Sequence, residues 1–269
     1  MTPRADTYTH GHHDAVLRSH RWRTVENSAA YLVPHLRPGL RLLDVGCGPG
    51  TLTVDLARRV APGQVVGIDV ASSVVQEARD HATAEGVGNV EFVVGDFRDA
   101  GLESGTFDLV HAHQVLQHLR DPVEALAGMA SLARSGGLVA ARDADYSAMV
   151  WAPPDERLDR WLAMYLAVTR RNGAEANAGR WLLRWARAAG LSETTYSTST
   201  WTYATAPQRA WWGGLWADRV TASSLAEQAV DYGIATPAEL AGIAAGLREW
   251  ARQPDAVFVA MHGEILARV

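Results

Sequence analysis

A glycine-rich stretch early in the chain has the spacing of a ligand-binding turn. It reads LLDVGCGPGT over residues 42–51, after an apolar run and before a helical pattern. Gly46, Gly48 and Gly50 allow the backbone to turn sharply and to approach a ligand where any Cβ would collide. The free N–H groups at the helix start then face that ligand. Asp69 ends the next apolar run, 19 residues after Gly50, where a ribose-binding acid belongs in a Rossmann-type unit.

The spacing of the glycines separates two classes of nucleotide cofactor. A dinucleotide site favours GxGxxG, whose third glycine packs the helix on the strand beside the pyrophosphate. This chain has GxGxG instead, with Asp44 two residues before the first glycine. A carboxylate there would repel a pyrophosphate and attract a ligand with a cationic end. The motif therefore favours S-adenosylmethionine, which carries an ammonium and a sulfonium and no phosphate, over a nicotinamide cofactor.

Short β-rich runs alternate with longer helical segments up to about residue 146, the pattern of a parallel sheet covered on both faces. The expected strands are residues 41–46, 65–70, 90–96, 107–113 and 138–144. Each is almost continuously apolar, as a strand buried on both faces is. Helices are expected over residues 52–60, 73–85 and 122–133, the last with Asp121 as its N-cap and Pro122 at its first position.

The flanking sequence is mostly helical. A polar, His-rich start precedes a helix expected over residues 23–36. Apolar residues at helical spacing predict further helices over 155–171 and 181–188, with Trp161, Trp181 and Trp185 in the core. The remaining expected elements are a strand over 195–203, two capped helices that begin after Thr205 and Thr236, and a closing strand over 256–268.

Residues 42–146 resemble a class I S-adenosylmethionine-dependent methyltransferase, closest to the ubiquinone/menaquinone C-methyltransferase-like group. The motif DVGCGPG, Asp69 and the Gly95–Asp96 pair carry the resemblance. It implies a Rossmann-like α/β fold, a doubly wound seven-stranded sheet in the order 3-2-1-4-5-7-6 with strand 7 antiparallel and an added helical cap. The closing strand at 256–268 lies where that order requires it.

The resemblance also implies the cofactor-binding residues, with S-adenosylhomocysteine as the product. Those expected around the methionine end are Asp44, Gly46, Cys47, Gly48, His113 and Gln114. Asp69 would bind both ribose hydroxyls, with Val70 beside the adenine. Asp96, after Gly95, would accept a hydrogen bond from the adenine amine, and Phe97 would cover the ring.

The chain is expected to divide around this cofactor module. The expected parts are N-terminal lid helices (1–38), the S-adenosylmethionine-binding core (39–146), a helical cap insertion (147–180), the rest of the core sheet (181–204 and 253–269) and a Trp-rich helical substrate insertion (205–252). Of ten tryptophans only Trp22 precedes residue 150. The Trp-rich part is therefore where acceptor specificity is expected.

Methyl transfer from a sulfonium is an in-line displacement that mainly needs alignment and exclusion of water. A base within about 3 Å would help if the acceptor must lose a proton. Candidates lie at the mouths of strands four and five, where ligands of open parallel sheets bind: His113, Asp143, Asp145 and Tyr146. A contact or structural role stays open for each. For His118, holding the following turn is the favoured role.

The acceptor pocket is expected to have aromatic walls. The expected substrate residues are Tyr8, His12 and His13 from the lid and Trp151, Tyr165, Trp211, Trp212, Trp216 and Arg219 from the later sequence, Arg219 as an anionic anchor. Such walls suit a planar apolar acceptor, or a cationic amine through its attraction to aromatic rings. Core packing and an oligomer interface are the alternatives for the Trp cluster.

Composition limits the partners. A net charge of -5 argues against a nucleic acid or an anionic membrane, which clustered basic residues would bind. The lone Cys47, the start of the chain and the lack of a long apolar run predict a cytoplasmic protein without a membrane span. The His-rich start matches no usual zinc spacing, so no metal site is expected. The expected partner is a small-molecule acceptor, and the chain is expected to be a monomer or homodimer.

These patterns favour an S-adenosylmethionine-dependent methyltransferase that acts on a small aromatic, quinone-like or specialised metabolite. Whether carbon, oxygen or nitrogen accepts the methyl group does not follow from the sequence. One alternative is a non-methylating binding or rearrangement protein that retains bound S-adenosylmethionine. Another is an NAD(P)-dependent oxidoreductase, which GxGxG and Asp44 disfavour.

Overall fold

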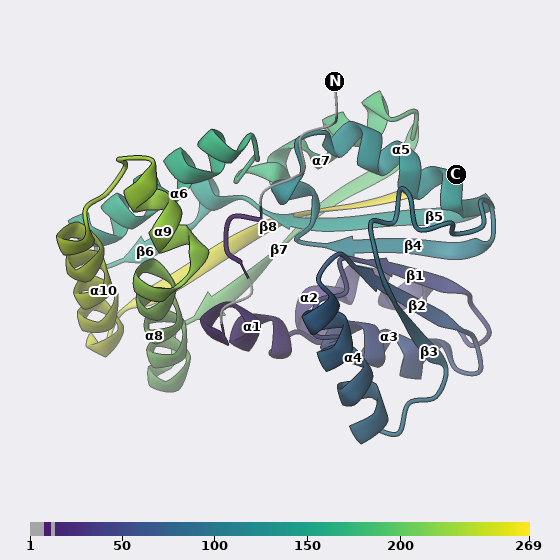
Figure 1. The fold of residues 1–269 in the computed structure, drawn as a ribbon, viewed down its shortest axis with the longest axis horizontal. Coiled ribbons are helices and arrows are strands. Elements are labelled where there is room, and N and C mark those ends of the chain that lie inside the picture. The colour runs from purple at the N-terminus through teal and green to yellow at the C-terminus, as the bar shows by residue number, and fades with distance from the viewer. Residues whose placement is uncertain (1–7, 12–13) are drawn as a thin grey trace.

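The computed structural model describes residues 8–11 and 14–269, and one mixed sheet runs through them (Figure 1). Its parallel strands are β1 (Leu42–Val45), β2 (Val65–Asp69), β3 (Val90–Val94), β4 (Phe107–His113) and β5 (Ala133–Ala144). The antiparallel ones are β6 (Val150–Ala152), β7 (Glu193–Tyr203) and β8 (Val257–Arg268). The carboxyl ends of the parallel strands share one edge of the sheet, which is where a ligand site forms.

The predicted strand order is confirmed. The sheet runs β3-β2-β1-β4-β5-β8, and β7 pairs with the other edge of β8, which is antiparallel to both of its long neighbours. The sequence did not predict β6. This short strand pairs with residues 257–259, whereas β5 pairs with residues 262–268 of the same strand. Because β8 extends past the end of β5, its first residues need another partner on that edge.

Helices cover both faces of the sheet, and alternate strand residues face each layer. Leu42 packs with α2 (Val25–Ser28), η1 (Ala30–His35) and α3 (Thr51–Val60). Leu43 packs with α5 (Pro122–Leu132) and α7 (Ala178–Ala188) on the other face. The helix α4 (Ser72–Ala84) lies beside α3 and contacts β2 and β3. The predicted cap of α5 is present, since Asp121 accepts a hydrogen bond from the backbone of Glu124.

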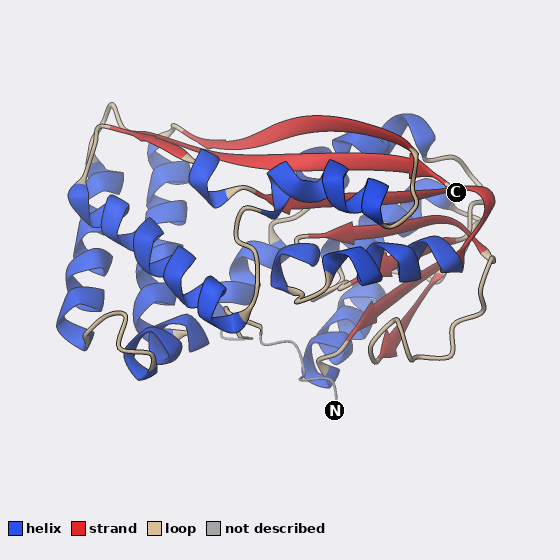
Figure 2. Cartoon of the chain, turned by 90° about the horizontal axis from the view of Figure 1, so that it is seen from above, coloured by secondary structure: helices blue, strands red, loops and turns tan. Residues whose placement is uncertain are grey.

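A helical lobe lies against one side of the sheet at the end where β6, the last residues of β7 and the first residues of β8 meet (Figure 2). It consists of α6 (Glu156–Asn172), α8 (Ala206–Ala222), α9 (Ser224–Asp231) and α10 (Pro237–Arg252). Both predicted capping boxes are present, at Thr205 and at Thr236. Trp161 is fully buried here, as expected, but Trp181 on α7 is 38% exposed, so its placement in the core was wrong.

The N-terminal segment differs from the single helix expected over residues 23–36. Thr24 caps the four-residue helix α2, which stops at Ala29, where the backbone leaves the helical region. A 3-10 turn containing Pro34 follows, because proline cannot donate the hydrogen bond that a continuing helix would need. The helix α1 (Asp14–Arg21), which the sequence did not predict, contacts α8 and α3. This segment therefore links the sheet to the helical lobe.

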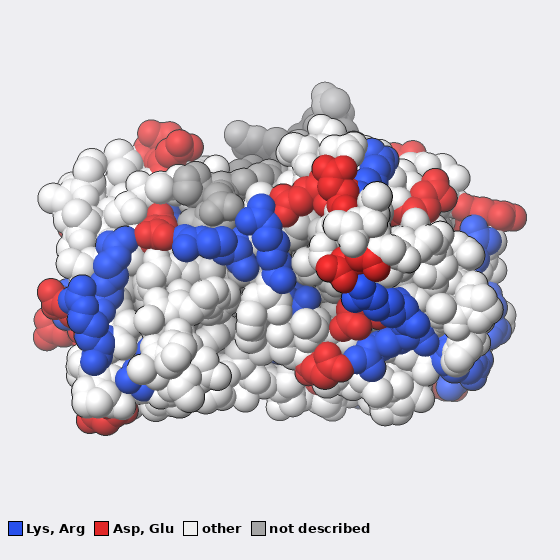
Figure 3. Space-filling view, turned by 90° about the horizontal axis from the view of Figure 1, so that it is seen from below, with Lys and Arg blue, Asp and Glu red and all other residues white. Residues whose placement is uncertain are grey.

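The described residues contain no helix of the length and apolarity that a bilayer crossing requires. Basic and acidic side chains are interspersed on the face shown in Figure 3, rather than gathered into one basic surface.

Candidate active site

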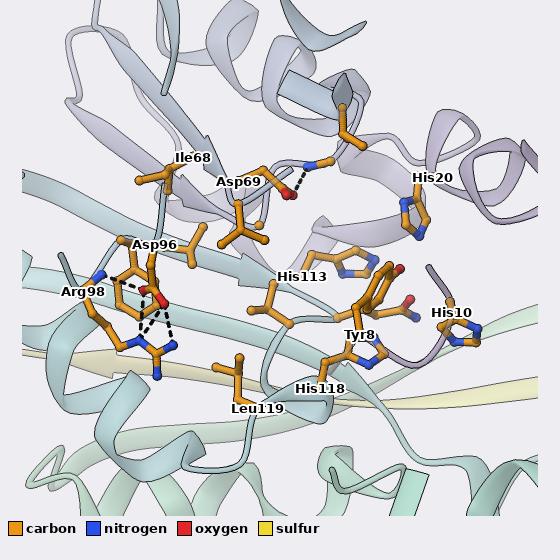
Figure 4. Close-up of a pocket in the computed structure, with 18 of the residues that line it drawn as sticks. Tyr8, His10, His20, Ile68, Asp69, Asp96, Arg98, His113, His118 and Leu119 are labelled. Carbon is orange, nitrogen blue, oxygen red and sulfur yellow. Dashed lines mark hydrogen bonds and ion pairs between the residues drawn. The ribbon is translucent and has the colours of Figure 1, made fainter. Parts of the chain in front are cut away.

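A cavity of about 960 Å³ opens at the carboxyl ends of β1, β2 and β4. Its walls come from the glycine loop, the turns after β2, β3 and β4, the N-terminal segment and one residue of α8. Figure 4 shows Tyr8, His10, His113 and His118 on one side and Asp96 with Arg98 on the other. The cavity therefore joins the sheet edge to residues from both ends of the chain.

The glycine loop has the left-handed backbone that its sequence predicts. Gly46, Gly48 and Gly50 have φ angles of 68°, 56° and 80°. A Cβ on Gly46 would lie 2.5 Å from Cγ2 of Val115, so packing as well as φ requires glycine there. A Cβ on Gly48 would meet only Nδ1 of His20, at 3.7 Å. Gly48 lines the cavity, so its backbone is the part of the loop that a ligand can approach closely.

Asp69 joins this loop to the cavity wall. One carboxylate oxygen accepts a hydrogen bond from the N–H of Gly48 at 3.1 Å, and the other accepts one from the N–H of Ala71 at 3.1 Å. The side chain is half-buried and lines the cavity. Each oxygen has a second lone pair, so the carboxylate can accept from two ligand hydroxyls while it holds the loop.

The turn after β3 forms another wall. Gly95, Asp96 and Phe97 all line the cavity, and the Phe97 ring is almost buried. The guanidinium of Arg98 binds the Asp96 carboxylate, with Nε 2.9 Å from Oδ1. This hydrogen bond lowers the pKa of Asp96, so the group is ionised at neutral pH. A ligand amine that binds Asp96 would therefore share the carboxylate oxygens with Arg98.

The end of β4 holds a strained residue. Gln114 has a φ of 55°, which among the described residues is the one positive value outside glycine. Its Oε1 accepts a hydrogen bond from Nη2 of Arg23 at 2.6 Å, and its Nε2 lies 2.9 Å from Nε2 of His262. The unusual backbone thus directs this side chain between an arginine and a histidine at the cavity edge.

His113 is the most exceptional group in the cavity. Its side chain is 4% exposed, and neither ring nitrogen has a hydrogen-bond partner among the described residues. Burial, with the nearby charges of Arg23 and Arg142, holds the pKa of His113 well below its usual range. The imidazole is therefore neutral at pH 7, and one ring nitrogen has a lone pair that can accept a proton.

Aromatic and imidazole rings surround the space beyond His113. Tyr8 meets His118 edge to face, with 4.8 Å between ring centroids. Tyr146 also lines the cavity and stacks on Tyr165, with 4.1 Å between centroids. His10 accepts or donates a hydrogen bond at Nε2, 3.0 Å from the Tyr165 hydroxyl. Burial raises the pKa of Tyr8 to about 12, so its hydroxyl stays protonated.

Comparison with known proteins identifies the family. The methyltransferase domain model matches residues 36–190, more than half of the chain. An uncharacterized methyltransferase of Schizosaccharomyces pombe is 34% identical over 226 residues, which cover 81% of each chain. This chain belongs to the methyltransferase domain family. S-adenosylmethionine is its cofactor.

Two further comparisons show how much of the sequence and of the fold this chain shares with other methyltransferases. The ubiquinone biosynthesis O-methyltransferase of Xanthomonas axonopodis is 40% identical over 109 residues, which cover 40% of this chain and 44% of that enzyme. A solved structure of phosphoethanolamine N-methyltransferase 2 from Haemonchus contortus, with phosphomonomethylethanolamine and S-adenosylhomocysteine, has a TM-score of 0.59 at 14% identity. The alignment covers 95% of this chain and 57% of that one. At this identity the likeness shows the fold.

The residues present fit this cofactor. The open side of Gly48 leaves room for a ligand against the backbone, and the Asp69 carboxylate beside it suits a diol. Arg23, at the recess between Gly46 and His113, suits a carboxylate. When bound, the cofactor supplies a methyl group on a sulfonium, which makes the methyl carbon electrophilic. Among the described residues, no group of three or more His, Cys, Asp or Glu side chains is placed to hold a metal ion.

Asp44 and Cys47 lie beside the main cavity rather than on it. Asp44 is 2% exposed, and its oxygens lie 2.7 Å from Nδ1 of His111 and 2.6 Å from Oγ1 of Thr53. It therefore ties β1 to β4 and α3 beneath the glycine loop. Cys47 is buried, and burial raises the pKa of its thiol. Both residues border a small recess next to Gly46. The other expected cofactor residues, Gly46, Gly48, Asp69, Val70, Gly95, Asp96, Phe97, His113 and Gln114, line the main cavity.

Two of the candidate bases are placed elsewhere. Asp143 is fully buried behind the cavity, where Oδ1 accepts a hydrogen bond from the N–H of Gln117 at 3.1 Å. Burial raises the pKa of Asp143 to about 7. Asp145 is paired with Arg180 on the same side. Asp143 thus supports the turn η2 (Leu116–His118) and does not reach the cavity, because alternate residues of β5 face opposite sides of the sheet.

The aromatic wall expected from the later sequence does not line this cavity. Its expected members Trp151, Tyr165, Trp211, Trp212 and Trp216 are absent from the lining. Trp212 packs on Phe258 with 3.7 Å between ring centroids, and Trp216 meets Trp161 at 4.7 Å. Both indoles belong to the core of the helical lobe, Trp212 against β8 and Trp216 against α6, where large aromatic side chains fill the space between the packed elements.

Among the expected substrate residues, Tyr8 and Arg219 do line the cavity, whereas His12 and His13 lie outside the described residues. Among the lining residues that the sequence did not identify as such are His10, His20, Arg23 and His118. His10 and His20 belong to the His-rich start, which stands out in the sequence but gives no indication of what these two residues do. Arg23 carried no signal, because a contact 91 residues away with Gln114 leaves no local pattern.

Proposed function

We propose that this chain transfers a methyl group from S-adenosylmethionine to a small molecule held between His113 and the N-terminal segment. One observation carries the proposal. A single cavity extends from Gly48 and Asp69, where the cofactor fits, to Tyr8 and Tyr146, and an unpartnered neutral imidazole lies within it. The substrate and the cofactor thus meet at the carboxyl edge of the sheet, as ligands of such folds do.

His113 would take the proton that the acceptor loses. Its buried ring is neutral over the physiological pH range, because its pKa is depressed. A base positioned within hydrogen-bond reach contributes about 10² to 10⁴ in rate when the acceptor must be deprotonated. The ring also faces His262, with 6.5 Å between centroids, so a neighbouring imidazole lies behind it.

The N-terminal segment would exclude water from the acceptor. Thr9 is fully buried, and its hydroxyl accepts a hydrogen bond from Nδ2 of Asn172 at 3.0 Å. His10 is held in the same way by Tyr165. These contacts attach the segment to α6 and close the cavity over Tyr146. Closure of this kind strengthens the electrostatic interactions inside and prevents side reactions with water.

The acceptor class is proposed from the relatives and the shape of the site. The ubiquinone O-methyltransferase, which matches 40% of this chain, supports an aromatic or quinone-like acceptor. The rings of Tyr8, His10, His118 and Tyr146 would contact a planar molecule from several sides.

A labelled-methyl assay tests the proposal. The protein is incubated with S-adenosylmethionine carrying a heavy methyl group and with a library of aromatic acids, quinones and phenols, and the products are weighed by mass spectrometry. We expect one product heavier by the labelled methyl, together with S-adenosylhomocysteine, and a loss of about 10² to 10⁴ in turnover for His113→Ala. Cofactor binding without any product would favour a non-methylating protein on the same scaffold. No cofactor binding would contradict both.

A further inference from the structure

Three hydrogen-bonded side chains meet at the carboxyl end of β4, and the middle one is the strained Gln114. Nη2 of Arg23, from the N-terminal segment, donates to Oε1 of Gln114 at 2.6 Å, and Nε2 of Gln114 lies 2.9 Å from Nε2 of His262 on β8. The backbone N–H of Gln114 donates to the carbonyl of Arg142 at 2.7 Å, which anchors the residue to β5. Gln114 is thus held from three sides in a backbone conformation that side chains rarely adopt.

The chemistry of these groups fixes the direction of both side-chain hydrogen bonds. A guanidinium can only donate, so the amide atom that faces Arg23 is the oxygen. The other amide atom of Gln114 is then the nitrogen, which donates to His262. Nε2 of His262 is therefore an unprotonated acceptor, and the ring proton lies on Nδ1. Burial, with the charges of Arg142 and Arg23, holds the pKa of His262 well below its usual range, so the ring is neutral at pH 7.

His262 is held in place by its neighbours. Its side chain is fully buried, and the ring of Trp201 on β7 packs against it with 4.3 Å between ring centroids. The indole N–H of Trp201 donates to the carbonyl of Asn27, and Trp22 meets the same indole edge to face at 5.2 Å. The N-terminal segment is therefore attached to β7 on either side of Arg23.

The other end of this chain of hydrogen bonds is a charged group without a counterion. Arg23 is half-buried and lines both the main cavity and the recess beside Gly46. Burial lowers the pKa of Arg23 to about 10, so the guanidinium stays charged at pH 7. No carboxylate among the described residues is ion-paired with it, and its buried Nε has no hydrogen-bond partner there. A cation removed from water without a partner is costly, so this position suits an anionic group of a ligand.

The recess beside the glycine loop has one charged group of each sign. Asp44 borders it together with Arg23. His20 and His113 also border it, and burial lowers the pKa of both well below the usual range, so both rings are neutral at pH 7. One carboxylate and one guanidinium complement the amino and carboxylate groups of an amino acid. The methionine portion of S-adenosylmethionine carries these two groups.

We propose that His262 is a positioning residue for cofactor binding. Through Gln114 it holds the Arg23 guanidinium beside the recess, where that group binds the carboxylate of the methionine portion. His262 does not line the cavity, so it acts only through Gln114. The inference concerns the cofactor, so it goes beyond the proposed function and does not depend on which acceptor is methylated. It also gives the backbone of Gln114 a role, because a φ of 55° directs the amide between Arg23 and His262.

Two ligands, with and without the amino acid end, test this. S-adenosylhomocysteine has that end, whereas 5′-methylthioadenosine shares the adenosine and the thioether but lacks the amino and carboxylate groups. Calorimetry measures both affinities in the unaltered protein, in His262→Leu, which removes the acceptor, and in His262→Gln, whose side-chain oxygen can accept from Gln114. We expect His262→Leu to weaken S-adenosylhomocysteine by about threefold to tenfold and 5′-methylthioadenosine by less than about twofold. His262→Gln should stay within about twofold of the unaltered protein for both ligands.

A double-variant cycle asks whether His262 acts through Arg23. Arg23→Gln alone should weaken S-adenosylhomocysteine by about tenfold or more, because a charge-assisted hydrogen bond to the carboxylate is lost. Adding His262→Leu to Arg23→Gln should weaken it further by less than about twofold, since the guanidinium that His262 positions is already gone. Losses that multiply would show that the two residues act independently.

The unaltered protein gives a test that needs no folded variant. Nitrogen NMR of the histidine side chains reports which ring nitrogen carries the proton, and we expect Nδ1 of His262 at pH 7. A proton on Nε2 would reverse the hydrogen bond with Gln114 and overturn the inference.

Three outcomes of the titrations would also overturn it: an unchanged affinity for S-adenosylhomocysteine in His262→Leu, an equal loss for both ligands in that variant, or independent losses in the double variant. If all results follow the expected pattern but no methylated product forms, only the proposed function fails. If S-adenosylhomocysteine does not bind the unaltered protein, both fail.

Discussion

The cofactor half and the helical lobe of this protein use their residues differently. In the first, backbone and charge make the site: Gly48 opens the loop and Asp69 holds it. In the second, large side chains make the structure, and one arginine reaches the cavity. The comparison teaches that the abundance of a residue type in a region does not show which residue acts there. Tryptophans are abundant in the lobe, yet Trp212 and Trp216 belong to its core and not to the site.

The largest expected effect is on the stability of the protein, and it tests whether Trp212 belongs to the core of the lobe or to the site. Trp212→Ala should lower the free energy of unfolding by about 3–5 kcal/mol, because it leaves a cavity among buried rings. Affinity for S-adenosylhomocysteine should not change in the protein that remains folded. Chemical denaturation and calorimetry measure the two quantities.

Trp181→Ala is the matched control for this substitution, since Trp181 is 38% exposed. Trp181→Ala should lower the free energy of unfolding by well under half as much as Trp212→Ala does. A similar cost for both variants, or a loss of cofactor affinity in folded Trp212→Ala, would show that the lobe is not built as described.

The next effect concerns Asp143, which lies under the site without lining it. Burial raises its pKa to about 7, well above the ordinary value of 3.8. The folded state thus favours the protonated acid, and the stability this gives is complete below about pH 4 and is lost as the pH rises through 7. Asp143→Asn should remove this loss, and its stability relative to the unaltered protein should rise by about 2–3 kcal/mol between about pH 5 and about pH 8.

Urea denaturation at the two pH values checks this prediction. Asp108→Asn is a suitable control, because Asp108 is ionised and bound to Arg134 at the surface and its pKa is lowered. A stability difference for Asp143→Asn that stays constant across the range would mean that Asp143 is ionised in the folded protein.

The smallest expected effect concerns the Asp96 carboxylate, whose oxygens Arg98 and a bound cofactor would share. Asp96→Asn should weaken S-adenosylhomocysteine binding by about 0.5–1.5 kcal/mol, the net value of an ordinary hydrogen bond, because Arg98 already occupies part of the carboxylate. Calorimetry measures it. Unaltered affinity would remove Asp96 from the adenine site.

Sequence alone predicts the cofactor half well because its requirements are local. A loop with positive φ needs glycine, and an acid that ends a parallel strand stays at the sheet edge, so Gly46, Gly48 and Asp69 all leave patterns within a short window. The strand order came from the family resemblance, which the glycine motif, Asp69 and the Gly95–Asp96 pair carry. The short strand β6 escaped because three residues carry no periodicity, and only the length of β8 requires it.

The acceptor half is harder to predict because it forms between distant segments. Tyr8, His113 and Arg219 meet only after α1 packs on α8 and on α3. The Trp-rich composition suggested a pocket, since burial in a core and burial around a ligand favour the same residues. What distinguishes them is direction: Trp212 packs against Trp250 of α10 and Phe258 of β8, whereas Arg219 donates to Val16 of α1 and lines the cavity.

The division between a cofactor end and an acceptor end is tested most directly by one titration series. S-adenosylhomocysteine is titrated into the unaltered protein, Asp69→Asn and Arg219→Gln by calorimetry. We predict that Asp69→Asn weakens binding by about 1–3 kcal/mol, because a carboxylate that accepts from the ribose is lost, and that Arg219→Gln changes it by less than about 0.5 kcal/mol. If Arg219→Gln weakens binding as much as Asp69→Asn does, the two ends are not separate and the account is wrong.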